Sequence, residues 1–113
     1  EFDGAMSVIA LNPMSCILGF NDYFILLRFT PLTATTTDVG IIWLVDENAS
    51  EGTDYEHEKI SEVGLAVMKA DCKLTDRQQK GIAMSGYRPG VYSNQEQLLN
   101  AFVQWYLKQL KTI

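Results

Sequence analysis

The chain has 113 residues and is expected to form one domain, residues 1–113. Its 47% hydrophobic and 20% charged residues are typical of a folded protein and argue against disorder. A net charge of −5 disfavours nucleic-acid or anionic-lipid binding, which needs a basic surface, and no apolar run is long enough to span a membrane.

The two cysteines, Cys16 and Cys72, are too few and too isolated to form a disulfide framework or a Cys-x-x-Cys metal site. We therefore expect two reduced thiols in a cytoplasmic protein. The first residues include no initiator methionine and no basic segment followed by an apolar one, which is the pattern of a signal peptide. They lead directly into a strand-like pattern, which favours a fragment of a longer polypeptide.

The first half of the chain contains four runs of the length and composition of β-strands. They cover residues 6–11, 15–20, 23–30 and 37–45. The short link Asn21-Asp22 predicts a tight hairpin between the second run and the third. These features predict an antiparallel meander of four strands.

The third run has two different faces. Ile25 and Leu27 lie on the face that we expect to be buried, together with Tyr23 and Phe29. Phe24 and Leu26 make the opposite face apolar as well. An apolar outer face and an unpaired strand edge invite self-association, so we expect a homo-oligomer.

An acidic loop, residues 46–58, precedes a long helix predicted over residues 59–84. Asp71 lies on the apolar stripe of this helix, four residues after Val67 and three before Leu74. An ionised carboxylate on a buried stripe is costly unless it is paired, protonated or bound to a cation. Asp71 is therefore either a structural acid at the edge of the stripe or a functional carboxylate held in a pocket. The stripe comprises Ile60, Val63, Val67, Ala70, Leu74 and Ile82.

A second helix is predicted after the turn at residues 87–90. Ser93 and Glu96 match the Ser-x-x-Glu capping box, so we expect this helix to begin at Ser93. An apolar and aromatic stripe follows it to Leu110. The whole pattern predicts an α+β fold, an antiparallel sheet meander followed by two C-terminal helices.

Several common catalytic motifs are missing from the sequence. There is no glycine-rich phosphate loop and no Gly-x-Ser-x-Gly elbow. His57 is the single histidine and lies in the acidic stretch, so neither a nucleophile–base pair nor a His-rich metal site is expected. On these patterns alone, the function is not readable.

Residues 71–110 nevertheless resemble the C-terminal end of the α-subunit catalytic domain of Rieske-type non-haem iron oxygenases. This family includes aromatic-ring-hydroxylating dioxygenases and relatives such as choline monooxygenase. The upstream strands are similar too, so the resemblance covers most of the chain. It is carried by Asp71, the Gln79-x-Gly81 step, Ser85 with Tyr87, Pro89-Gly90, and Ser93-x-x-Glu96 before an aromatic helix.

The resemblance implies a role for Asp71. In this family a 2-His-1-carboxylate triad holds the catalytic iron, and the carboxylate precedes the Gln of the Gln-x-Gly step by eight or nine residues. Asp71 precedes Gln79 by eight. It would fix the geometry of a mononuclear Fe(II) and offset its charge. Val67 and Leu74 are candidates to line the substrate pocket, with packing in the core as the alternative.

The resemblance also implies what this chain would need from outside. Both histidine ligands and the Rieske [2Fe-2S] cluster would lie elsewhere, so the chain alone is expected to be inactive. The intact enzyme would take electrons from NAD(P)H through a reductase or ferredoxin. It would use O₂ to oxygenate an organic substrate, either aromatic or a small quaternary amine. The implied fold is part of a helix-grip (START/Bet v 1-like) catalytic domain.

A second interpretation is a non-enzymatic helix-grip domain that holds an apolar small molecule between sheet and helix. It accounts for the sheet, the stripes and the missing histidines. It does not account for Asp71 or for the pattern from Gln79 to Glu96.

Overall fold

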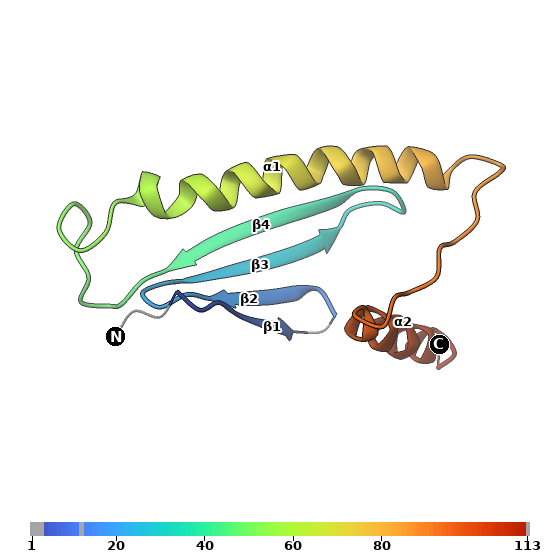
Figure 1. The fold of residues 1–113 in the computed structure, drawn as a ribbon, viewed down its shortest axis with the longest axis horizontal. Helices are drawn as coiled ribbons and strands as arrows, with labels where there is room; N and C mark the ends of the chain where they lie inside the picture. The colour runs from blue at the N-terminus through green and yellow to red at the C-terminus, as the bar shows by residue number, and fades with distance from the viewer. Residues whose placement is uncertain (1–3, 12, 113) are drawn as a thin grey trace.

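The computed structural model describes residues 4–11 and 13–112, which form one antiparallel sheet and two helices (Figure 1). The sheet has the strand order β1-β2-β3-β4, a simple meander. The predicted α+β fold, with four strands followed by two helices, is confirmed. The elements are β1 (Ser7–Leu11), β2 (Ser15–Gly19), β3 (Phe24–Pro31), β4 (Thr37–Leu44), α1 (His57–Ile82) and α2 (Gln97–Leu110).

The core of the molecule lies on one face of β3. Ile25 and Leu27 are its buried hydrophobic residues, with 4% and 9% of their surface exposed. Ile25 pairs with Trp43 across the β3–β4 ladder, and Leu27 pairs with Ile41. The predicted buried face of this strand is therefore confirmed.

The β2–β3 hairpin forms at the predicted link. The backbone N–H of Phe20 donates to the carbonyl oxygen of Tyr23 at 2.9 Å, which closes the turn around Asn21-Asp22. No non-glycine residue in the described ranges has a positive φ, so this turn does not use the left-handed conformation that such hairpins often need.

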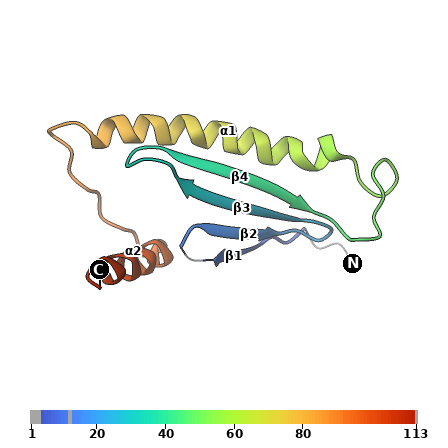
Figure 2. The same ribbon diagram turned by 180° about the vertical axis from the view of Figure 1, so that it is seen from behind.

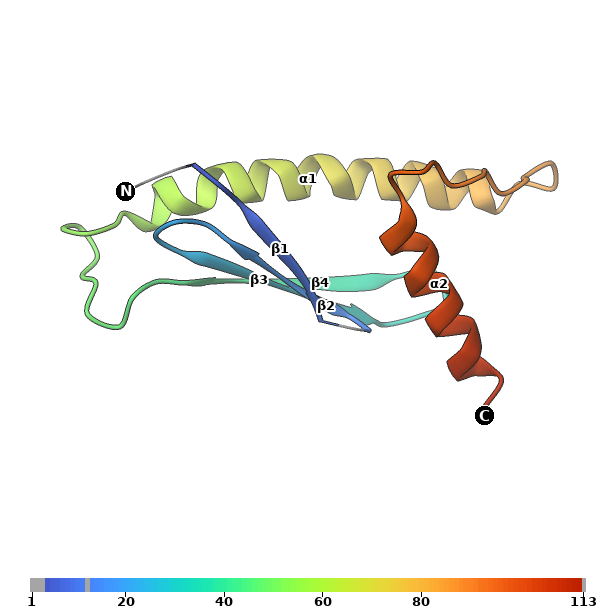
Figure 3. The same cartoon turned by 60° about the horizontal axis from the view of Figure 1, so that its bottom comes forward.

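Helix α1 lies along one face of the sheet (Figure 3). It approaches most closely at Gly64, where an added Cβ would lie 3.4 Å from Trp43 and 3.5 Å from Ile25. Ser61, one turn earlier, is buried, and its hydroxyl donates to the carbonyl of Glu58 at 3.3 Å. The sheet-facing side of α1 thus runs through Ser61, Gly64 and Met68, and it is formed by small and polar residues as much as by apolar ones.

The apolar stripe predicted for this helix is not its buried side. Val63, Val67 and Leu74 are 70%, 54% and 60% exposed. They lie roughly 110° around the helix axis from the sheet-facing residues. The prediction that the stripe is buried is wrong, because α1 meets the sheet on the side of Ser61 and Gly64, where Trp43 and Ile25 leave room for only a small residue at position 64.

The outer face of the sheet is apolar and uncovered. Ile9, Ile17, Leu26 and Ile42 form one cross-strand row, since the register pairs each with the next. Phe24 and Ile42 are 50% and 49% exposed. Neither helix packs over this face in the part of the chain that the structure describes.

The loop before α1 is ordered by Asp46. Its carboxylate accepts hydrogen bonds from the backbone N–H of Asn48 at 2.9 Å and from the side-chain amide of Asn48 at 3.1 Å. The backbone bond, followed by the side-chain bond, lowers the pKa of Asp46 below its ordinary value. The acidic segment that leads into the helix is therefore a structured turn.

Helix α2 lies past the end of the sheet and is joined to α1 by an extended segment (Figures 1 and 2). None of its described residues is buried. The radius of gyration is 17.5 Å, whereas a compact domain of this length has about 13 Å. The molecule is thus elongated, and α2 keeps its apolar stripe accessible.

Helix α2 begins at Gln97, so the predicted start at Ser93 is wrong. Ser93 and Glu96 instead close a separate turn, in which the N–H of Glu96 donates to the carbonyl of Ser93 at 3.1 Å. The Glu96 carboxylate accepts the backbone N–H of Ser93 at 2.7 Å, which is the returning half of a capping box.

We expect Gly64→Ala to stabilise the protein and Gly64→Leu to destabilise it. An alanine Cβ would make ordinary contacts with Trp43 and Ile25, and alanine favours a helix over glycine by about 1 kcal/mol. Leucine would push α1 away from the sheet. Thermal unfolding followed by circular dichroism would measure both. A lower melting temperature for Gly64→Ala would contradict the close approach described here.

The Ser93–Glu96 turn should weaken in acid. The hydrogen bond from the Ser93 N–H lowers the pKa of Glu96 below its ordinary value of 4.5. The resulting stabilisation is present above the ordinary pKa and is lost as the pH falls through the lowered value. A ¹³C NMR titration would show this shift. Ser93→Pro, which removes the donor, should return the pKa toward 4.5, whereas Ser93→Ala should keep most of the shift.

Candidate active site

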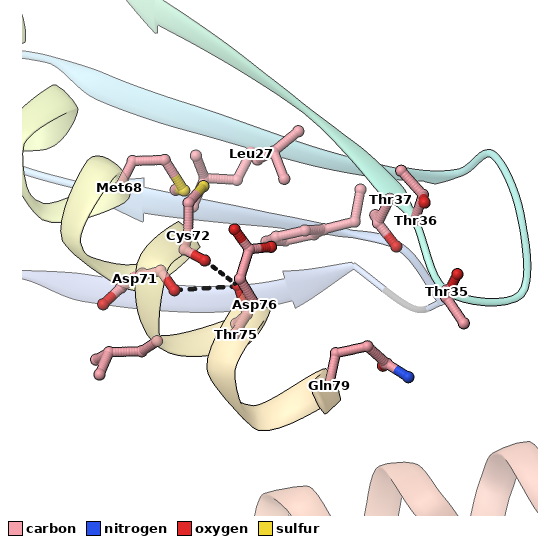
Figure 4. A pocket seen from close by; sticks show the side chains of 13 residues that line it. Leu27, Thr35, Thr36, Thr37, Met68, Asp71, Cys72, Thr75, Asp76 and Gln79 are labelled. Carbon is pink, nitrogen blue, oxygen red and sulfur yellow. Dashed lines mark hydrogen bonds between the residues drawn. The ribbon is translucent and has the colours of Figure 1, made fainter. Parts of the chain in front are cut away.

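A groove of about 800 Å³ lies between the C-terminal half of α1 and the end of the β3–β4 hairpin (Figure 4). Helix α1 supplies one wall. The strands and the Thr35–Thr37 turn supply the other. The lining residues are Leu27, Phe29, Thr35, Thr36, Thr37, Val39, Met68, Asp71, Cys72, Leu74, Thr75, Asp76 and Gln79.

The groove has an apolar part and a polar part. Leu27, Phe29 and Met68 provide hydrocarbon and thioether surface, whereas Asp71 and Asp76 provide carboxylates. Such a mixture suits a small organic ligand that is oriented by a few polar groups.

The hydroxyl of Thr75 is turned back to the helix. It donates to the backbone carbonyl oxygens of Asp71 at 3.1 Å and of Cys72 at 3.0 Å, as the dashed lines in Figure 4 show. The other polar side chains that α1 contributes to the groove are those of Asp71, Cys72, Asp76 and Gln79.

Asp71 lies in the groove, but it is exposed. It is placed between the sheet-facing side of α1 and the exposed apolar stripe. The argument that burial forces this carboxylate to bind a cation therefore does not hold for the described chain. Its assignment as an iron ligand stays a prediction that rests on the spacing from Asp71 to Gln79. Both of these residues line the same groove.

The structure separates the two predicted substrate-pocket residues. Leu74 lines the groove, and Val67 does not. The alternative prediction, that Val67 and Leu74 pack in the core, is wrong for the described chain, because both side chains are more than half exposed. A role in the substrate pocket of a larger domain stays a prediction for both.

The sequence patterns did not predict that Met68 and Thr75 line a groove together with Gln79, which was singled out only as part of the Gln79-x-Gly81 step. These residues mix apolar and polar side chains, so a search for an apolar stripe could not group them. The available signal was Gly64, because a glycine inside a helix often marks a close approach of another backbone or side chain.

The described residues do not form a complete metal site. They contain no cluster of three or more His, Cys, Asp or Glu side chains that could hold an ion. His57 lies fourteen residues before Asp71, about 21 Å along the helix axis, so the two cannot share a metal. His57 instead meets Trp43 edge-on, with ring centroids 6.3 Å apart. A carboxylate is a suitable ligand for Fe(II), so Asp71 fits as one member of a ligand set whose other members lie outside this chain.

Comparison with known proteins identifies the family. Residues 2–112 match the model of the ring hydroxylating alpha subunit (catalytic domain). The chain belongs to this family. The resemblance inferred from the sequence is thus confirmed, and the match places the chain among the α-subunits of Rieske-type oxygenases.

Similar curated proteins are oxygenase subunits. The chain is 33% identical over 109 residues to the glycine betaine monooxygenase oxygenase subunit of Pseudomonas aeruginosa, in each of two strains, which covers 95% of this chain and 25% of that protein. It is 34% identical over 105 residues to the protein of the same name from Chromohalobacter salexigens, covering 91% and 23% respectively. The chain therefore spans about a quarter of the length of these relatives.

Neither helix α1 nor helix α2 is long and apolar enough to cross a lipid bilayer.

The 113-residue chain alone should bind Fe(II) weakly. Asp71 and Asp76 are groove carboxylates without a nearby histidine, and an incomplete ligand set holds Fe(II) poorly. Anaerobic titration with Fe(II), followed by calorimetry, should show no tight stoichiometric binding. Tight binding of one Fe(II) per chain would require a ligand set other than the one proposed below.

Proposed function

We propose that this chain is the C-terminal portion of the catalytic domain of a Rieske-type monooxygenase that hydroxylates a small quaternary amine, with Asp71 as the carboxylate ligand of its iron. The observation that carries this proposal is the placement of Asp71 and Gln79 in one groove of a chain that matches the family over residues 2–112. The intact protein would be cytoplasmic and would contain the Rieske domain and both histidine ligands.

Asp71 would hold the mononuclear iron together with two histidines from the rest of the catalytic domain. When bound, the iron would activate O₂ with electrons that come from NAD(P)H through a reductase or ferredoxin and the [2Fe-2S] cluster. The Asp71 carboxylate would offset part of the metal charge and would not act as an acid or base. Asp71 is exposed in this structure, so its carboxylate is accessible to ligands from outside the chain.

The apolar groove walls would exclude water from the reacting substrate. Leu27, Phe29 and Leu74 would provide this surface. In the net reaction, one atom of O₂ would enter a C–H bond of the substrate as a hydroxyl group. The other atom would leave as water, with a pair of electrons and a pair of protons consumed.

Two observations support a quaternary amine as the substrate class. The relatives described above are named for glycine betaine, and they match more than nine-tenths of this chain. In addition, an aromatic ring and a carboxylate, Phe29 and Asp76, line the same groove. Aromatic faces and carboxylates are the groups that recognise a quaternary ammonium.

The proposal is tested in the full-length oxygenase supplied with its electron donor. The wild-type enzyme should consume O₂ when glycine betaine is added, and not when benzoate is added. Asp71→Ala should abolish this activity and lose the mononuclear iron while the visible absorbance of the Rieske cluster remains, because the cluster has its own ligands in another domain.

Asp76→Ala provides the matched control. It removes a carboxylate from the same wall of the groove and should keep the mononuclear iron. Metal analysis would compare the two variants. If Asp71→Ala keeps its mononuclear iron, Asp71 is a structural acid. If the wild-type enzyme responds to benzoate rather than to glycine betaine, the substrate class is wrong although the family is right.

A further inference from the structure

Gln79 lies at the centre of the groove wall that α1 forms. It follows Met68 by eleven residues and Ser61 by eighteen, which are about three and about five full turns of a helix. Ser61 is buried against the sheet, and Met68 and Gln79 both line the groove. The side chain of Gln79 therefore continues the sheet-facing side of α1. This placement follows from contacts within the chain, since both walls of the groove belong to it.

The strand wall opposite this amide carries threonine hydroxyls (Figure 4). Side chains alternate along a strand, so Thr37 shares the inner face of β4 with Val39, and both line the groove. Thr35 lines it from the hairpin turn. The turn is held by its backbone, because the N–H of Leu32 donates to the carbonyl of Thr36 at 2.9 Å. Among the described residues, no hydrogen bond uses the hydroxyl of Thr35 or Thr37.

The groove thus separates hydrogen-bond acceptors from neutral donors. Asp71 and Asp76 are carboxylates, which when ionised only accept, and they lie on opposite sides of Gln79, about 80° and about 60° around the helix axis. The Gln79 amide and the threonine hydroxyls can donate. Among the described residues that line the groove, none is a lysine, arginine or histidine.

We infer that Gln79, Thr35 and Thr37 bind a carboxylate group of the substrate. This inference rests on the proposed function and narrows it: the quaternary amine is a zwitterion, and these three residues select it. Gln79 lies about 12 Å beyond Asp71 along the helix axis, so the carboxylate points away from the proposed iron ligand and the N-methyl groups point toward it.

The spacing on α1 suits a small zwitterion. Asp76 and Gln79 are three residues apart, so their Cβ atoms are about 5–6 Å apart. A molecule whose ammonium and carboxylate are separated by a single methylene can therefore contact Asp76 and Gln79 at the same time. Its ammonium lies against Asp76 and Phe29, and its carboxylate accepts hydrogen bonds from the Gln79 amide and the threonines.

Neutral donors are the suitable choice at this position. A lysine or arginine beside Asp76 would pair with that carboxylate and would repel the adjacent ammonium of the ligand. An amide and hydroxyls recognise a carboxylate through charge-assisted hydrogen bonds without adding a positive charge. A ligand that lacks the carboxylate leaves these donors unpaired, which selects against it.

The test compares glycine betaine with tetramethylammonium, which has the same cationic group and no carboxylate. Calorimetry under anaerobic conditions measures the affinity of the full-length oxygenase for each. Gln79→Leu should weaken the binding of glycine betaine about tenfold or more, because a hydrogen bond to a charged group is lost. It should leave the binding of tetramethylammonium unchanged. Thr37→Val, which keeps the shape of the side chain and removes the hydroxyl, should act in the same direction from the other wall.

Gln78→Leu is the matched control. It makes the same change at the neighbouring residue, which does not line the groove, and should leave both affinities unchanged. Gln79→Glu should weaken the binding of glycine betaine more than Gln79→Leu does, because it places a negative charge against the carboxylate. Each variant should keep its mononuclear iron, since none removes a proposed ligand.

The inference is overturned if Gln79→Leu does not change the affinity for glycine betaine, or if it weakens both ligands equally, as a packing role would. If Gln79→Leu does not fold, the same two results for Thr37→Val decide. A wild-type enzyme that neither binds nor oxidises glycine betaine overturns the proposed substrate class and this inference with it. Wild-type turnover of glycine betaine, combined with unchanged binding in Gln79→Leu, overturns this inference alone.

Discussion

The close approach of α1 to the sheet at Gly64 fixes the rest of the structure. At this point the helix lies against Trp43 and Ile25, which are paired across β3 and β4. The contact sets both the distance of the helix from the sheet and its rotation about its own axis. It also has a cost: the indole N–H of Trp43 is buried and has no hydrogen-bond partner among the described residues. Such a group is destabilising unless packing compensates for it.

The rotation set at Gly64 leaves a large apolar surface uncovered. The stripe of Val63, Val67 and Leu74 is exposed on α1, and the outer row of Ile9, Leu26 and Ile42 crosses the sheet. A chain with two buried hydrophobic side chains in its described part has little core with which to offset the entropy of folding. The chain spans about a quarter of the length of its relatives. In the larger catalytic domain proposed above, further layers would bury these surfaces.

The sequence predicted the strands, the meander and the buried face of β3, because strand alternation depends on residues that are neighbours in the chain. The prediction of which side of α1 is buried was wrong. The most apolar stripe and the sheet-facing side of this helix differ, because the sheet packs closely on the small residues Ser61 and Gly64. The start of α2 was misplaced for a similar reason: the Ser93–Glu96 motif forms its own turn, and the helix begins after it. The groove could not be predicted from periodicity, since the turn at Thr35–Thr37 meets α1 only through the tertiary fold.

The position of Asp71 depends on both the local sequence pattern and the tertiary packing of α1. Local pattern placed it on a buried stripe, and the structure places it at an exposed edge of the groove, between the sheet-facing side of α1 and the apolar stripe. A side chain at such an edge lies where an additional layer of protein would close over the helix. This is a suitable position for a carboxylate that completes a ligand set with side chains from elsewhere. Its position follows from the rotation of α1 that the contact at Gly64 sets. A bulky side chain at Gly64 would push α1 away from the sheet and would therefore move the proposed ligand.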